Sequence, residues 1–104
     1  MLRIQRTRKK GHRLPPNTLV VTRGTKFGND VGKGLANDKA VIAFTDWFYA
    51  EEQRQFRLDF AQTCRDRNIQ NIACWCDLAD MCHGDVLVNY WLYDSECYGF
   101  RHPK

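Results

Sequence analysis

Three cysteines and a histidine lie within ten positions of one another in the stretch ACWCDLADMCHGD, residues 73–85: Cys74, Cys76, Cys82 and His83. Thiolate and imidazole are preferred ligands of Zn²⁺, so one hypothesis is a Cys₃His zinc site, although C-x-C and an adjacent Cys-His pair are not the usual zinc spacing. A second hypothesis makes Cys76 or Cys82 a nucleophile, with His83 as its base. In a third, the cysteines are small apolar residues of the core.

The glycine-rich loop RGTKFGN, residues 23–29, is a second candidate site. Arg23 and Lys26 have the side chains that hold an anion such as phosphate, and glycine allows backbone amides to approach a ligand closely. Asn29 has two interpretations, because its amide would either orient the loop or bind a polar edge of the ligand. The loop therefore indicates an anionic ligand, and a phosphate would fit.

Positive charge is concentrated in the first third of the chain. Residues 1–29 contain eight Lys or Arg and no acid, whereas residues 30–104 contain eight basic and twelve acidic side chains. This segregation favours a polyanionic partner, either nucleic acid or a phosphorylated ligand, and the alternative is a solvated basic surface. Residues 1–16 form a basic arm, and the residues that would neutralise phosphates of DNA or RNA are Arg3, Arg6, Arg8, Lys9, Lys10 and Arg13.

The length of 104 residues predicts one domain, residues 1–104, with a thin core. The five cysteines are an odd number, and no N-terminal apolar segment resembles a signal peptide or is long enough to cross a bilayer. We therefore expect a cytoplasmic protein with reduced thiols and no membrane partner.

The apolar periodicity predicts five elements. They are a strand over 18–22, a helix over 39–50, a helix over 51–67, a strand over 71–75 and a helix over 85–93. Asp38 is expected to cap the first helix, and Asn68 to end the second. The start of the arm also shows the weak alternation of a short edge strand.

The order strand, helix, helix, strand, helix predicts an α/β fold, with a small mostly parallel sheet flanked by about three helices in a Rossmann-like single domain. Ligands of such sheets bind outside the carboxyl ends of the strands, where both candidate loops fall, so Arg23 and His83 should share one crevice. The first amides of the last helix would favour an anion there. Asp85 would cap that helix or accept a hydrogen bond from a ribose hydroxyl.

Four separated motifs, RIQR, TLVVTRGTKFGN, ACWC and CHGDVL, resemble DUF4326, a domain of unknown function found in bacteria and many of their phages. The resemblance extends over nearly the entire chain. It implies that the family's first loop motif is matched by Arg23, Thr25, Lys26, Gly28 and Asn29. Phe27 stands where the family has tryptophan, which puts base stacking in doubt. The family's activity is unsettled, so the resemblance implies no reaction.

These observations predict binding of a phosphate-bearing ligand, a nucleotide or a derivative, in the crevice at the strand ends. The expected ligand-binding residues are Arg23, Thr25, Lys26, Gly28, Asn29 and Asp85, and the candidate catalytic residues are Cys76, Cys82 and His83. One alternative is a non-catalytic module of a phage that binds nucleic acid or a host protein through the basic arm. The other is a domain stabilised by zinc on Cys74, Cys76, Cys82 and His83. The sequence identifies no other cofactor and leaves open whether the protein is an enzyme.

Overall fold

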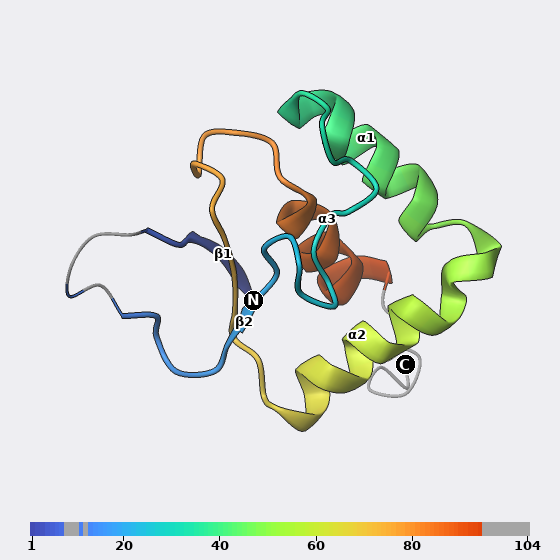
Figure 1. Ribbon diagram of the computed structural model, residues 1–104. Coiled ribbons are helices and arrows are strands. Elements are labelled where there is room, and N and C mark those ends of the chain that lie inside the picture. The colour runs from blue at the N-terminus through green and yellow to red at the C-terminus, as the bar shows by residue number, and fades with distance from the viewer. Residues whose placement is uncertain (8–10, 12, 95–104) are drawn as a thin grey trace.

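The computed structural model describes residues 1–7, 11 and 13–94. These residues form the predicted small α/β unit with a parallel sheet (Figure 1). Its three strands pair in the order β1-β3-β2. The strands are β1 (Leu2–Gln5), β2 (Thr18–Val20) and β3 (Asn71–Cys74). The helices are α1 (Asn37–Phe48), α2 (Arg54–Asp66) and α3 (His83–Asn89), with a short 3-10 turn at Glu51–Gln53 and a π turn at Tyr90–Asp94.

Strand β3 is the centre of the sheet, because β1 and β2 each pair with it and not with each other. Ile72 and Ala73 are fully buried, which is the burial expected of a parallel strand covered on both faces. The strand predicted over 18–22 ends at Val20, but Val21 still donates its amide hydrogen to the Ala73 carbonyl at 2.9 Å. The carboxyl ends of β2 and β3 therefore lie side by side.

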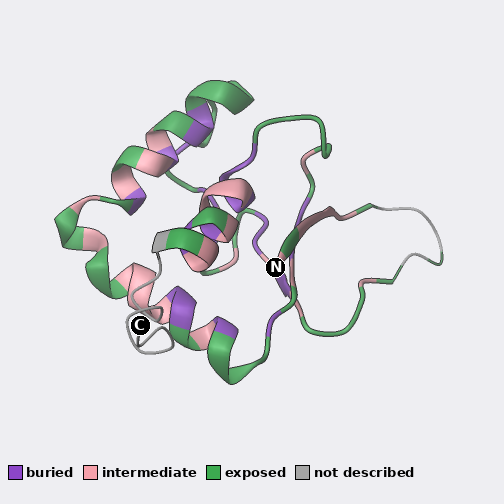
Figure 2. Ribbon diagram, turned by 180° about the vertical axis from the view of Figure 1, so that it is seen from behind, coloured by how far each residue is buried: buried purple, intermediate pink, exposed green. Residues whose placement is uncertain are grey.

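Helices α1 and α2 connect β2 to β3. Figure 2 shows their buried residues on inward faces, as the i, i+4 spacing of Phe44 and Phe48 predicts. The cap predicted at Asp38 is wrong: Ala36 is the N-cap, and the Asp38 carboxylate accepts the Lys39 amide from within the first turn. Asn68 does follow the end of α2, with a positive φ of 50°.

Helix α3 contacts β1 and β3 on one side and α1 on the other (Figure 1). It begins at His83, two residues before the predicted start, because Cys82 is its N-cap and accepts the Gly84 amide on Sγ at 3.4 Å. A cap at Asp85 is therefore wrong. Asp85 lies in the first turn, where its carboxylate pairs with an arginine of β1 instead.

Arg3 of β1 joins this strand to α3 and to the loop before it. Its Nε donates to Asp85 Oδ1 at 2.7 Å, and only 7% of its side chain is exposed. Its Nη atoms donate to the carbonyl oxygens of Asp77, Leu78 and Asp80 at 3.4, 3.0 and 3.0 Å. The guanidinium thus fixes the loop 75–82, and its ion pair with Asp85 also ties the edge strand β1 to α3.

Replacing Arg3 by lysine is expected to lower the free energy of unfolding by about 2 kcal/mol, because an ammonium cannot reproduce the planar fork that reaches a carboxylate and several carbonyls at once. Urea unfolding measures the difference. Arg13→Lys, at an exposed arginine, is the matched control and should change the stability little. Equal effects of the two substitutions would contradict the role given to Arg3.

Candidate functional site

A pocket of about 210 Å³ lies at the carboxyl ends of β2 and β3. Arg23 and Asn29 line it from the loop after β2, and the loop after β3 contributes Cys74, Cys76, Cys82 and His83. The two loops therefore converge on one crevice, as the strand order predicted. Sequence reasoning missed the third wall, which Asn37, Ala40 and Val41 of α1 provide, and it also missed Trp75 and Met81.

Trp75 is 39% exposed and lines the pocket, although a large aromatic residue directly after a buried strand would ordinarily pack into the core. The reason is that β3 ends at Cys74, so the alternation of a strand no longer directs the next side chain inward. Arg6 lies over the Trp75 ring, with its Cζ 4.7 Å from the ring centroid.

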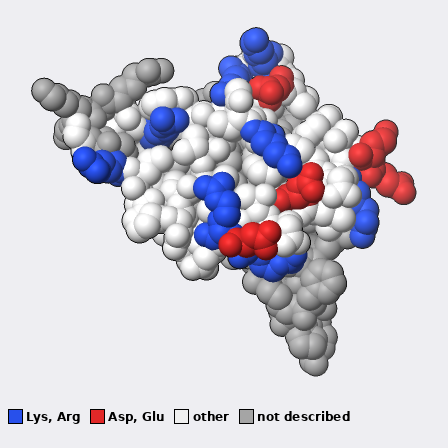
Figure 3. Space-filling model, turned by 60° about the horizontal axis from the view of Figure 1, so that its bottom comes forward, with Lys and Arg blue, Asp and Glu red and all other residues white. Residues whose placement is uncertain are grey.

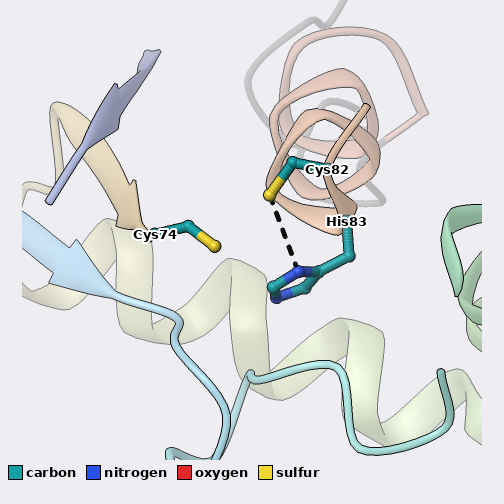
Figure 4. A group of neighbouring side chains, drawn as sticks. All are labelled: Cys74, Cys82 and His83. Carbon is teal, nitrogen blue, oxygen red and sulfur yellow. Dashed lines mark hydrogen bonds between the residues drawn. The ribbon is translucent and has the colours of Figure 1, made fainter. Parts of the chain in front are cut away.

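The side chains of Cys74, Cys82 and His83 point toward one another (Figure 4), and all three line the pocket. Their Sγ atoms and one imidazole nitrogen all lie within 4.8 Å of one another, and the residues are only 6%, 2% and 5% exposed. Cys82 Sγ lies 3.8 Å from His83 Nδ1. Cys76 adds a third sulfur, 3.7 Å from Cys74 Sγ, and is half-buried. We refer to these four residues as the cysteine-histidine cluster.

The orientation of the His83 ring is set by a hydrogen bond to the first loop. Its Nε2 lies 3.0 Å from the carbonyl oxygen of Phe27. Because a carbonyl only accepts, Nε2 carries the hydrogen, and in the neutral ring Nδ1 keeps a free electron pair. Burial lowers the pKa of His83, which favours that neutral form. Nδ1 therefore keeps its lone pair 3.8 Å from the Cys82 sulfur.

Hydrogen bonds among the thiols make them chemically unequal. The hydrogen bond from Cys82 lowers the pKa of the Cys74 thiol to about 5, with help from the Cys76 amide. Donating that bond raises the pKa of Cys82, and burial raises the pKa of Cys76. Of the three thiols, these hydrogen bonds favour the thiolate form most at Cys74, and a thiolate is both a nucleophile and a metal ligand.

Asn29 orients the loop rather than facing a ligand with a free amide. It is buried, its Oδ1 accepts the Gly32 amide at 2.8 Å, and its Nδ2 donates to the Ala40 carbonyl of α1 at 3.1 Å. Of the two interpretations given to this residue, the contacts match orientation of the loop.

Gly28 and Thr25 also serve the shape of the loop. A Cβ on Gly28 would lie 2.3 Å from the Thr22 carbonyl oxygen, so only glycine allows the chain to pass there. The Thr25 hydroxyl donates to the same oxygen at 2.6 Å. This tight turn brings the Phe27 carbonyl to His83.

Arg23 and Lys26 face different surfaces, although three positions separate them. Arg23 lines the pocket, and its Nε and Nη2 donate to the carbonyls of Asn29 and Gly32, each at 3.3 Å. Lys26 has 62% of its side chain exposed and pairs with Asp59 of α2 at 3.4 Å, over a separate, open hollow that Thr25 also lines. The structure thus brings one of the two predicted cations to the crevice.

The basic arm is partly used inside the molecule, because Arg3 binds Asp85 and Arg6 covers Trp75. Arg13 is exposed, and Arg8, Lys9 and Lys10 lie outside the described residues. On the face shown in Figure 3, Lys and Arg side chains lie among Asp and Glu rather than in one patch. Within residues 1–7, 11 and 13–94, none of the helices has the length and apolar character that a bilayer span requires.

Comparison with known proteins gives one match. The family described as a domain of unknown function, DUF4326, matches residues 4–92. A search of curated proteins and a search of solved structures found no match. The matched span covers both loops of the pocket and the whole cysteine-histidine cluster. The chain therefore belongs to the DUF4326 family.

Proposed function

We propose that this domain binds one zinc ion through the cysteine-histidine cluster, which lines the pocket. The observation that carries the proposal is the approach of three ligand atoms, from Cys74, Cys82 and His83, to within 4.8 Å of one another. They come from the end of β3 and the start of α3, so the sheet and a helix preorganise them.

The distances between donor atoms support tetrahedral coordination. With zinc–sulfur bonds of about 2.3 Å, neighbouring ligands of a tetrahedral ion lie about 3.8 Å apart. Cys74 and Cys76 Sγ are separated by 3.7 Å, and Cys82 Sγ and His83 Nδ1 by 3.8 Å. Two edges of the required tetrahedron therefore have nearly the right length.

The partner of His83 also supports a metal ligand. Imidazole ligands commonly donate their second ring N–H to a carboxylate or a backbone carbonyl, which fixes the tautomer and raises the basicity of the coordinating nitrogen. The Phe27 carbonyl accepts such a bond from Nε2. Thiolate and imidazole ligands in tetrahedral arrangement favour Zn²⁺ over the oxygen-seeking Mg²⁺ and Ca²⁺.

Protein purified under reducing conditions from zinc-supplemented medium is expected to carry about one zinc per chain, because a preorganised thiolate-imidazole site binds zinc tightly. Elemental analysis by mass spectrometry measures the content. Cys82→Ser and His83→Gln should each reduce it to less than about a tenth of an equivalent.

Cys64→Ala is the matched control, since Cys64 is a buried cysteine of α2 outside the cluster. It should keep its zinc. Circular dichroism establishes that each variant is folded. A zinc content of less than about a tenth of an equivalent in the wild-type protein would contradict the zinc proposal.

A second function, binding of a phosphate-bearing small molecule in the same pocket, is favoured by Arg23. Among the described residues, Nη1 of its guanidinium has no hydrogen-bond partner, while Nε and Nη2 hold the loop. A guanidinium beside a pocket of this size can bind an oxyanion by charge-assisted hydrogen bonds. The pocket volume of about 210 Å³ suits a small ligand or one part of a nucleotide.

Arg23→Ala is expected to weaken the binding of inorganic phosphate by about tenfold or more, because it removes a charge-assisted contact. Isothermal titration calorimetry at constant ionic strength measures the affinity. Lys26→Ala removes an equal charge three positions away, on a different surface, and should leave binding unchanged. An equal loss of affinity in the two variants would contradict binding in the pocket, because it would mean that phosphate binding depends only on the net charge of the protein.

A further inference from the structure

The four side chains of the cysteine-histidine cluster all line the pocket, but they are held differently. Cys74 ends β3, His83 is the first residue of α3 and Cys82 is the N-cap of that helix, so a strand end and a helix start fix these three ligands. Cys76 lies in the loop 75–82. Its Sγ is 3.7 Å from Cys74 Sγ but is outside the group of three atoms that lie within 4.8 Å of one another. Cys76 is therefore the least constrained member.

The type of zinc site depends on the fourth ligand. Structural sites are closed by four protein ligands, whereas reactive sites have three and keep one position for water or substrate. A pair of cysteines and a histidine is one of the ligand sets found in sites of the second type. Cys74, Cys82 and His83 form such a set, and it borders a pocket instead of being enclosed by core.

We infer that zinc held by Cys74, Cys82 and His83 has an exchangeable fourth position facing the pocket, filled either by Cys76 or by an oxygen of water or of an anionic small molecule. The inference rests on the zinc site proposed above. It assigns the ligand class, because Arg23 and Asn37 line the same pocket and would meet the remaining oxygens of a phosphate or carboxylate group.

The exchange needs little movement of the chain. Arg3 binds the backbone carbonyls of Leu78 and Asp80, so the loop stays in place while the Cys76 side chain turns away. Cys76 leaves the metal as a thiol and takes one proton from solvent. The entering anion supplies the coordinating oxygen and the negative charge that the thiolate removed, and no bond within the ligand changes.

Cobalt substitution tests the exchange, because the thiolate-to-cobalt and d–d absorption bands report the number and type of ligands. The full chain is freed of zinc, loaded with Co²⁺ and titrated with inorganic phosphate at constant ionic strength, with chloride as the control anion. Phosphate should change the d–d bands and remove the absorption of one thiolate. In Cys76→Ala the charge-transfer band should start one thiolate weaker, and the d–d bands should respond at lower phosphate concentration.

Metal affinity separates the exchangeable ligand from the anchored ones. Cys76→Ala should lower cobalt affinity by no more than about tenfold. Cys74→Ala should lower it by at least about a hundredfold, because this substitution removes one of the three anchored ligands. Cys64→Ala is the matched control. Cys76→Ser repeats the removal of the Cys76 thiolate with a side chain of similar size. Circular dichroism establishes that each variant is folded.

The outcomes distinguish the two proposals. Wild-type protein that binds neither zinc nor cobalt overturns the zinc site itself. Two results would overturn the exchangeable position and leave a closed structural site. One is that Cys76→Ala abolishes metal binding as completely as Cys74→Ala does. The other is that phosphate leaves the cobalt spectra unchanged in both the wild type and Cys76→Ala.

Discussion

The hydrogen bond from His83 Nε2 to the Phe27 carbonyl oxygen joins the two segments on which the site depends. On one side of it is the loop after β2, whose turn exists because Gly28 passes close to the Thr22 carbonyl. On the other side is α3, whose first residue is the histidine. This bond fixes the tautomer of His83 and ties the loop to the cysteine-histidine cluster.

Because of this constraint, the polar residues of the first loop have a role other than direct ligand contact. The side chains of Thr25 and Asn29 form hydrogen bonds within the loop and to α1. These bonds position the Phe27 carbonyl next to the His83 imidazole. Arg23 is the exception, because part of its guanidinium stays available in the pocket. The loop is thus an outer support of the cluster that also brings one cation to its rim.

Much of the fold could be predicted because strong local patterns agree with tertiary burial. Phe56, Phe60 and Cys64 repeat at intervals of four, and the structure has α2 over them, with Phe60 and Cys64 fully buried. Helix starts were harder. Cysteine is an unusual cap, and Asp85 looked like a better one until Arg3, 82 positions away, proved to bind it.

The meeting of the two loops at one sheet edge could be predicted from the sequence, but the surface that each residue of these loops faces could not. Arg23 and Lys26 have similar charge and are neighbours in the motif, yet Gly24, with a φ of 90°, lets the chain turn so that they face different surfaces. Asn37 and Trp75 carried no signal of their own, because one begins a helix and the other follows a strand that ended one residue early. Such assignments depend on where the backbone turns, which residue type alone does not determine.

The strand order has a consequence for how the molecule forms. Strands β1 and β2 come first along the chain, but each pairs only with β3, more than fifty residues later than β2. While the growing chain on the ribosome ends before Asn71, β1 and β2 cannot pair, because β3 has not yet been synthesised. Sheet formation is therefore a late, long-range event that follows the synthesis of α1 and α2. The cysteine-histidine cluster can assemble only later still, because Cys82 and His83 come after β3 in the chain.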